Sequence, residues 1–374
     1  MNRNGSTAFS MSKKSYFLLL LLNCSILTLN AQTRAQRLDS LFSALYQTGQ
    51  FSGNVLIAEN GKPVYKKSFG FSNLENQQPL DAGTRFLLGS VSKQFTAAGI
   101  VMLRDAGKLS LDDSLTKYLP ELPYQNITLR QVLHHTSGLP DYIALMDNKW
   151  DKNKYATNED MLRMLVQYRP DPLFAPGQKY AYCNTGYALL ALVIERVSGR
   201  SFTDYMEGEV FKKFGLDHTI IYTRRTRPRK VADYALGYVF QDSLQKWVLP
   251  DVHPQDLWED GIYGEDGVNS TTSDLLKWDQ AVFNRTVLPN PDWNDILTAG
   301  EVREGTCDYG FGWHIINPDA KGRIAYHSGG WPGYIAYNEQ HLDHNRTIII
   351  LRNKFAAAIK TPTAAVRQVL EQKN

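Results

Sequence analysis

Residues 85–93 read Arg-Phe-Leu-Leu-Gly-Ser-Val-Ser-Lys and join a short apolar segment to a predicted helix. Between residues 94 and 108 the apolar side chains recur at helical spacing, and Gly107 is a residue type that commonly ends a helix. Ser90 therefore lies at the start of the helix, and Lys93 follows three residues later on the same face. An amine there can take the serine proton, and the free N–H groups of a helix start favour a developing anion. The stretch predicts a nucleophilic Ser90; the alternative is a serine that only caps the helix.

The Ser-x-x-Lys pattern alone is not specific, because it also begins at Ser10, Ser114 and Ser243. Ser10 lies in a segment typical of a targeting peptide. No long helical pattern follows Ser114, and Ser243 lies in a polar stretch between expected strands. Ser90 alone combines an apolar approach, a permissive glycine and a long amphipathic helix.

Two further motifs follow Ser90 along the chain. Tyr182-Cys183-Asn184 is a Tyr-x-Asn motif, and His327-Ser328-Gly329 is a basic residue followed by a hydroxyl residue and glycine. Tyr124 begins a second Tyr-x-Asn match, whereas His-x-Gly occurs once. In this order the three motifs resemble those of serine β-lactamases and penicillin-binding proteins. The resemblance is strongest to the class C-like branch, which also contains D-alanyl-D-alanine carboxypeptidases, D-aminopeptidases and esterases.

The resemblance extends from about residue 40 to the C-terminus. Residues 133–139, 174–177 and 267–270 look like further stretches of the same family. It implies that Ser90 attacks a carbonyl carbon and forms an acyl-enzyme. Lys93 would act as the base, or would hold Tyr182 as a phenolate, with desolvation and nearby positive charge lowering the pKa of the amine. Tyr182 would pass the proton to the leaving group; the alternative is that Tyr182 is a packing residue.

The same resemblance assigns the substrate-binding residues. Asn184 would hydrogen-bond the catalytic lysine and a substrate amide, and Ser328 would contact a substrate carboxylate or carbonyl. The backbone N–H groups of Gly330 and of the nucleophilic serine would form an oxyanion hole. Gly329 would let substrate approach the strand closely. No metal and no cofactor is expected.

His327 departs from the Lys-Thr-Gly that many β-lactamases carry at this place. A lysine is a permanent cation, whereas a histidine near its usual pKa of about 6.5 is only partly charged. The substitution favours a D-alanyl peptidase or an esterase over a dedicated β-lactamase. A strand-end residue without a role in binding is the alternative for His327.

The N-terminal segment has the pattern of a secretory signal peptide. Lys13 and Lys14 precede an apolar run at residues 16–22, and residues 1–31 as a whole are expected to be removed. A retained membrane anchor is the alternative. The protein is therefore expected in the periplasm or outside the cell, without a membrane span after removal of the leader.

Composition and charge exclude some functions. The chain has 374 residues, 43% of them hydrophobic, which is enough for a large core. The formal net charge of +3 comes from three basic residues within 1–31, so the remaining chain is neutral and carries no electrostatic footprint for nucleic acid. The basic run at 224–230 is interpreted as a solvated loop. A monomer is expected.

Cysteine and histidine usage does not indicate a metal site or a disulfide framework. Cys183 and Cys307 remain after leader removal, and whether they pair is open, although Cys183 is expected to be a buried free thiol. No Cys/His cluster has zinc spacing. His134 and His135 are expected to be structural.

The expected fold is α+β, with one antiparallel sheet built from both ends of the chain and a mainly helical lobe inserted between them. Strands are expected at 54–58, 64–69, 310–316, 323–327, 334–341 and 347–352. Helices are expected near 128–136, 158–168, 184–198, 202–214, 272–284 and 362–372. Within a hydrolase domain at 32–374, the sheet lobe would comprise about 40–105 and 290–374, and the helical lobe about 106–289. This arrangement matches the β-lactamase/transpeptidase-like fold that the resemblance implies.

These patterns together predict an exported serine hydrolase that works through an acyl-Ser90 intermediate. D-alanyl peptides, including peptidoglycan-derived ones, small esters and β-lactams all suit that machinery. A family member that keeps the pocket only as a binding surface or scaffold is the rival hypothesis. An α/β-hydrolase is excluded, because the sequence contains no Gly-x-Ser-x-Gly motif.

Overall fold

The computed structural model describes residues 32–223, 231–250, 258–316 and 322–372. The predicted leader at 1–31 and the basic run at 224–230 lie outside the described residues. The chain divides into two compact units, one of residues 1–41 with 363–374 and one of residues 42–362. The first unit contains the start of helix α2 (Arg34–Gln47) and helix α12 (Thr363–Glu371), with Leu38, Val366 and Leu370 buried.

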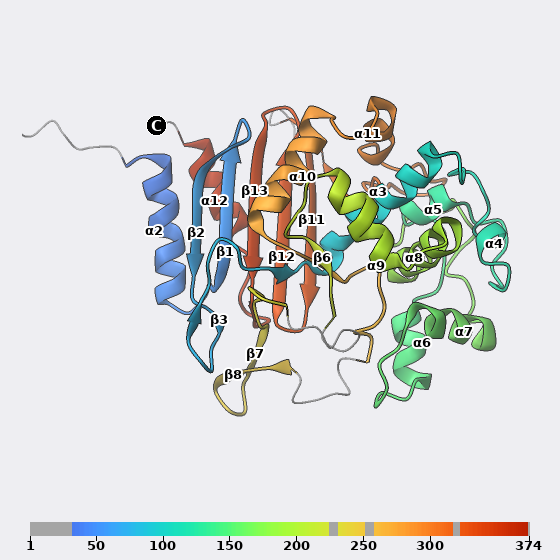
Figure 1. The fold of residues 1–374 in the computed structure, drawn as a ribbon, viewed down its shortest axis with the longest axis horizontal. Helices are drawn as coiled ribbons and strands as arrows, with labels where there is room; N and C mark the ends of the chain where they lie inside the picture. The colour runs from blue at the N-terminus through green and yellow to red at the C-terminus, as the bar shows by residue number, and fades with distance from the viewer. Residues whose placement is uncertain (1–31, 224–230, 251–257, 317–321, 373–374) are drawn as a thin grey trace, which may run out of the picture. The chain divides into compact units, whose positions relative to one another are not determined.

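A six-stranded antiparallel sheet, in the order β10-β11-β12-β13-β1-β2, forms the centre of the second unit (Figure 1). Its strands are β1 (Gly53–Glu59), β2 (Lys62–Phe69), β10 (His314–Ile316), β11 (Ile324–Trp331), β12 (Tyr334–His341) and β13 (Arg346–Arg352). β1 pairs with β13 along its whole length, from Gly53 opposite Arg352 to Glu59 opposite Arg346. The predicted sheet built from both ends of the chain is therefore confirmed.

Short turns with left-handed residues set the register of two hairpins. Asn60 and Gly61, with φ of 51° and 72°, connect β1 to β2, as the Asn-Gly pair predicts. Gly333, with φ of 91°, lies in the turn from β11 to β12, and a side chain there would overlap the backbone of Gly237. This second turn places the residues after the His-Ser-Gly motif directly beside the next strand.

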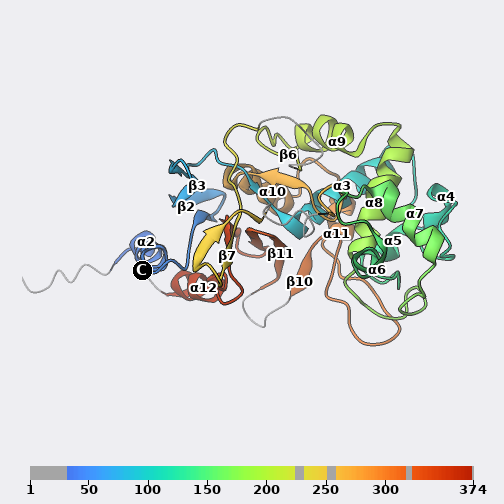
Figure 2. The same cartoon turned by 90° about the horizontal axis from the view of Figure 1, so that it is seen from below.

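A group of helices lies to one side of the sheet, beyond β11 (Figure 2). It comprises α3 (Ser92–Asp105), α4 (Leu115–Tyr118), α5 (Leu129–Leu133), α6 (Tyr142–Lys149), α7 (Asn158–Tyr168), α8 (Asn184–Ser198) and α9 (Phe202–Tyr205). α8 is buried from Thr185 to Ile194 and packs against α3, α5 and α7. Its end at Gly199, with φ of 71°, is a left-handed C-terminal glycine.

Short elements complete the unit. β3 (Phe71–Asn73) pairs with β4 (Gln78–Pro79), and β9 (Val268–Ser270) lies between β5 (Phe86–Leu87) and β6 (Ile220–Ile221). β7 (Tyr238–Gln241) lies between β8 (Lys246–Val248) and the parallel β14 (Lys354–Phe355). The remaining helices are α10 (Thr272–Asn284) and α11 (Asn290–Ile296). Among the described residues, no helix combines the length and the apolar character that a membrane crossing requires.

Three predicted elements are shorter or less regular than expected. The helix expected at 128–136 ends at Leu133, because His135 adopts a left-handed φ of 57°. The helix expected at 202–214 contains a π-helical turn, η2 (Met206–Phe211). The strand expected at 310–316 is limited to His314–Ile316, because Gly312, with φ of 81°, approaches the backbone of Gln94.

The lobe boundaries stay a prediction, and two helices make contacts across them. α10 falls within the range given to the helical lobe but packs against β13, β1 and β12 of the sheet. α3 falls within the range given to the sheet lobe but packs against α8. A buried hydrogen bond from Trp278 on α10 to Gln94 on α3 joins the two (2.9 Å), and all these elements belong to the same compact unit. Amphipathic periodicity identifies a buried face but not the element that covers it.

Candidate active site

Ser90 lies on a short 3-10 turn, η1 (Gly89–Val91), directly before α3. η1 lies against β11 so closely that a Cβ on Gly329 would come 1.9 Å from the carbonyl oxygen of Leu88. A Cβ on Gly89 would likewise come 2.6 Å from the backbone N of Gly330. The two glycines therefore bring the nucleophile turn and the third motif together, as the predicted oxyanion hole of Ser90 and Gly330 N–H groups requires.

Lys93 is fully buried one helical turn from Ser90. Its Nζ donates to Ser90 Oγ (3.1 Å), Asn184 Oδ1 (2.9 Å) and the carbonyl oxygen of Glu265 (3.0 Å). An ammonium group has three N–H donors, so these three acceptors use all of them. A carboxylate oxygen of Glu265 lies 3.4 Å from the same nitrogen as an ion-pair partner.

The pKa of Lys93 is shifted in the direction opposite to the one expected from the sequence. Burial disfavours the ammonium form, but Tyr182, Glu265 and Asp266 outweigh burial and raise the pKa of Lys93 above its usual value. Positive charge is expected near Lys93 from the sequence, whereas the structure places the carboxylates of Glu265 and Asp266 there. In this arrangement Lys93 Nζ is a hydrogen-bond donor to Ser90 Oγ.

Tyr182 lies beside this cation, in the segment that leads into α8. Lys93 Nζ is 5.0 Å from the centre of the Tyr182 ring, and the Tyr182 side chain is 39% exposed. Asn184, two residues later, is the first residue of α8. The Tyr-x-Asn motif thus supplies a partly exposed phenol next to the lysine and an amide oxygen that accepts from it.

His135 supports the Tyr182 segment from behind. Its ring centre is 4.3 Å from that of Tyr182, and its Nδ1 accepts a hydrogen bond from the backbone N–H of Cys183 (3.1 Å). Burial, and then the charge of Lys93, lower the pKa of His135 well below its usual value, so the ring is neutral. The structural role that the sequence predicts for His134 and His135 agrees with these contacts; His134 donates from Nδ1 to the Tyr309 carbonyl oxygen (2.8 Å).

His327 does not occupy the exposed position that its predicted role requires. Residues alternate along β11, so Ser328 and Gly330 are exposed whereas His327 and Gly329 are buried. His327 is 2% exposed; its Nδ1 donates to the Ser328 carbonyl oxygen (2.7 Å) and its Nε2 accepts from the Tyr309 hydroxyl (2.8 Å). Burial, followed by the charge of Lys93, lowers the pKa of His327 well below its usual value. His327 is therefore a neutral support of the strand and not a cation that faces substrate.

The sequence analysis missed four residues near the lysine: Glu265, Tyr142, Tyr309 and His314. Glu265 accepts a hydrogen bond from the Tyr142 hydroxyl (2.5 Å) in addition to its contacts with Lys93. The rings of Tyr309 and His314 lie 6.0 and 6.5 Å from that of Tyr182. The sequence signal for Glu265 is the Gly-Glu-Asp-Gly stretch at 264–267, whose last residue begins the family-like segment at 267–270.

The cysteines and candidate metal ligands were also located. Cys183 is a buried free thiol, as predicted, and Cys307 is also free. Within the part of the chain that the structure describes, no group of three or more His, Cys, Asp or Glu side chains is arranged to hold a metal ion.

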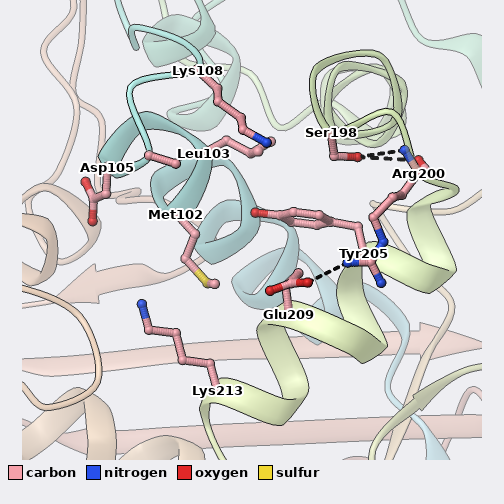
Figure 3. A pocket seen from close by; sticks show the side chains of 10 residues that line it. Met102, Leu103, Asp105, Lys108, Ser198, Arg200, Tyr205, Glu209 and Lys213 are labelled. Carbon is pink, nitrogen blue, oxygen red and sulfur yellow. Dashed lines mark hydrogen bonds and ion pairs between the residues drawn. The ribbon is translucent and has the colours of Figure 1, made fainter.

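A separate pocket of about 490 Å³ lies between the ends of α3 and α8 and the start of η2 (Figure 3). It contains none of the predicted site residues. Its cations include Lys108 and Arg200, which follow the C-terminal ends of α3 and α8, where positive side chains offset the helix dipole. Arg200 is also paired with Glu209, so the lining has a structural explanation.

With this geometry, comparisons with known proteins define the class of the chain. A family model described as Beta-lactamase matches residues 38–371, so the chain belongs to the β-lactamase family. Penicillin-binding protein 4* of Bacillus subtilis (strain 168) is 40% identical over 327 residues, which are 86% of this chain and 72% of that protein.

Solved structures agree with this family. The crystal structure of a penicillin-binding protein from Bacillus halodurans has a TM-score of 0.74 and 28% identity, and covers 88% of this chain and 98% of that one. A class C β-lactamase has a TM-score of 0.70 and 22% identity, with 93% and 99% covered, which shows likeness of fold alone. The predicted superfamily and the β-lactamase/transpeptidase-like fold are therefore confirmed, and the chain is a serine hydrolase.

Proposed function

We propose that the protein cleaves esters or D-alanyl peptides through an acyl-enzyme on Ser90, with Tyr182 as the group that receives the serine proton. The observation that carries this proposal is the hydrogen bond from Lys93 Nζ to Ser90 Oγ, in a setting that keeps Lys93 charged. Tyr182 lies beside this buried cation, with Lys93 Nζ 5.0 Å from the centre of its ring, and opposite charges on neighbouring groups stabilise each other.

The reaction then proceeds in two stages, acylation of Ser90 and hydrolysis of the acyl-enzyme. The Tyr182 phenolate takes the Ser90 proton as Oγ bonds to the substrate carbonyl carbon, and the N–H groups of Ser90 and Gly330 hold the carbonyl oxygen as it becomes negative. The carbon–leaving-group bond breaks and Tyr182 returns its proton to the leaving nitrogen or oxygen. Water repeats the sequence at the acyl-Ser90 carbonyl, with Tyr182 taking a proton from water and returning it to Oγ.

The third motif supports the choice of substrate class. Because His327 is buried and neutral, it supplies no positive charge for a substrate carboxylate, and the exposed Ser328 hydroxyl is the side-chain contact that the motif offers. This favours substrates recognised mainly through the scissile carbonyl and neighbouring amides. β-Lactams remain the second candidate, because relatives are named as penicillin-binding proteins.

Intact-protein mass spectrometry separates these substrates. Residues 32–374 are exposed to a fluorescent penicillin, a p-nitrophenyl ester and a D-Ala-D-Ala peptide, with turnover followed in parallel and Ser90→Ala as the matched control. The proposal expects ester or peptide turnover and slow release of any penicilloyl group. Fast penicillin turnover would establish the β-lactamase alternative. If the folded protein forms no adduct and shows no turnover with any of the three substrates, a non-catalytic binding protein is favoured.

We also propose that the protein is exported to the periplasm or the exterior and acts as a monomer. The charge and apolar pattern of residues 1–31 supports export. N-terminal sequencing of the protein recovered from fractionated cells tests this, since an intact N-terminus in the cytoplasmic fraction would contradict it. Light scattering after size exclusion tests the monomer.

A further inference from the structure

The segment that carries Glu265 is tied to α3 on both sides of the acid. Thr96 Oγ1 donates to the carbonyl oxygen of Gly264 (2.7 Å), and Ser92 Oγ accepts from the backbone N–H of Val268 (3.1 Å). Ser92 and Thr96 are one helical turn apart, so they share the face of α3 that also carries Lys93. These two bonds place Glu265 opposite Lys93.

The glycine before the acid makes this close approach possible. Gly264 adopts φ of 95°, and a Cβ there would come 2.4 Å from the carbonyl oxygen of Tyr187 on α8. The chain therefore passes directly over α8 and then turns toward α3. Gly267, with φ of 100°, turns the chain again after the two acids. The four-residue Gly-Glu-Asp-Gly segment thus has a conformation that only its glycines allow.

Both carboxylate oxygens of Glu265 are used inside the protein. One lies 3.4 Å from Lys93 Nζ, and the other accepts from the Tyr142 hydroxyl of α6 at 2.5 Å. Glu265 is only 6% exposed, so water screens the ion pair poorly. A buried ion pair of this kind holds its lysine charged, because loss of the proton would leave the carboxylate unpaired.

On the basis of the function proposed above, we propose that Glu265 is a positioning residue that fixes Lys93 as an ammonium ion. With Lys93 charged, Tyr182 is the group that accepts the proton of Ser90. Tyr142 holds the Glu265 carboxylate in the orientation that reaches Lys93. Neither residue touches the substrate.

Other titratable groups surround this pair. They are two carboxylic acids, Glu259 and Asp266, the phenols of Tyr182 and Tyr187, and the imidazoles of His135 and His327. Burial and the charge of Glu265 raise the pKa of Asp266 to about 7 and that of Glu259 to about 8. At neutral pH these two acids are wholly or partly protonated, so Glu265 is the main carboxylate counter-charge of Lys93 beside Tyr182, and the two imidazoles are neutral.

The direct test is an NMR titration of Lys93 in protein labelled with ¹³C at the lysine ε-carbon. The Lys93 signal is assigned by its loss in Lys93→Met. Glu265→Gln keeps the shape and removes the charge, so the midpoint of the Lys93 titration is expected to fall by about one to three pH units, the usual effect of an opposite charge at this distance. Tyr142→Phe removes the hydroxyl and leaves the charge, so a much smaller fall is expected. An unchanged midpoint in Glu265→Gln would overturn the proposal.

Glu265→Asp serves if Glu265→Gln does not fold. It withdraws the carboxylate by one methylene, so the midpoint is expected to fall in the same direction by a smaller amount, and an unmoved midpoint would again contradict the proposal. This readout does not depend on turnover. If the protein is not acylated at Ser90 but the Lys93 midpoint still falls in Glu265→Gln, the proposed reaction is wrong. The effect of Glu265 on the charge of Lys93 would then still hold.

The linkage also predicts a kinetic signature. Loss of the Glu265 charge eases deprotonation of Lys93, so the limb of the pH dependence of ester acylation that reports Lys93 should move to lower pH. A purely structural role would lower the rate without moving that limb.

Discussion

The charge of one side chain, Lys93, decides how the site works. Its nitrogen is surrounded by acceptors, namely a hydroxyl, an amide oxygen, a backbone carbonyl and a carboxylate. Such a shell stabilises an ammonium ion, because a neutral amine would donate fewer hydrogen bonds to the same acceptors. In the proposed mechanism, the Ser-x-x-Lys motif supplies a nucleophile and a fixed cation, and the phenol of the second motif is the base.

Lys93→Met should reduce acylation of Ser90 nearly as far as Ser90→Ala does, by about 10³-fold or more, because groups that act as a unit fail together. Stopped-flow acylation by a p-nitrophenyl ester measures this. Lys108→Met, which removes an exposed lysine of the pocket in Figure 3, is the matched control and should keep the wild-type rate. If Lys93→Met acylates within tenfold of the wild type, the fixed cation is not required.

At the scale of elements, contact between η1 and β11 positions the site. The two elements are 233 or more residues apart in the chain and touch through backbone atoms at Gly89 and Gly329. The sequence indicated both glycine-bearing motifs, but the closeness of the contact between them follows from tertiary packing, which spacing along a chain does not encode.

Gly329→Ala should destabilise the protein by about 2 kcal/mol or more, because its Cβ would overlap the Leu88 carbonyl oxygen and force η1 away from β11. Gly330→Ala is the control on the same strand. A Cβ there meets nothing nearer than Ile335 at 3.8 Å, so stability should change by less than about 1 kcal/mol. Urea unfolding of the two variants measures the difference, and equal stabilities would show that η1 adapts without cost.

The end of α5 should make stability depend on pH. Burial, opposed by the bond to the Tyr309 carbonyl, lowers the pKa of His134 to about 4. In the unfolded chain the His134 imidazole binds a proton near pH 6.5. The free energy of unfolding is therefore expected to be highest above pH 6.5 and to fall by about 3 kcal/mol in all as the pH falls from 6.5 to 4. His134→Asn retains an N–H donor without titrating in this range. Urea unfolding at pH 7 and pH 4 should show a smaller loss for the variant, and identical losses would contradict this role.

At the scale of the whole molecule, the sequence predicted the family and the fold. Apolar runs at both ends of the chain indicated the sheet, and the ordered motifs indicated Ser90, Lys93, Tyr182 and Asn184, which the structure brings together. Alternation along β11 buries His327 and exposes Ser328.

Residues brought in by tertiary contact alone could not be predicted. Glu265 reaches Lys93 because two glycines and two hydroxyl groups of α3 hold its loop, and no periodicity marks such a contact. The left-handed His135 and the π-helical turn at 206–211 are likewise responses to packing. Helices and strands carry repeating signals, whereas a buried ion pair between distant segments does not.

Covalent labelling is the most direct test of Ser90 as the nucleophile. Purified protein is treated with a fluorophosphonate, digested and mapped by tandem mass spectrometry. Ser92, which is buried and bonded to Val268, serves as the neighbouring control through Ser92→Ala. We predict one adduct, on the peptide that contains Ser90, abolished by Ser90→Ala and retained when Ser92 is replaced. Undiminished labelling of Ser90→Ala, or an adduct on another serine, would contradict the account.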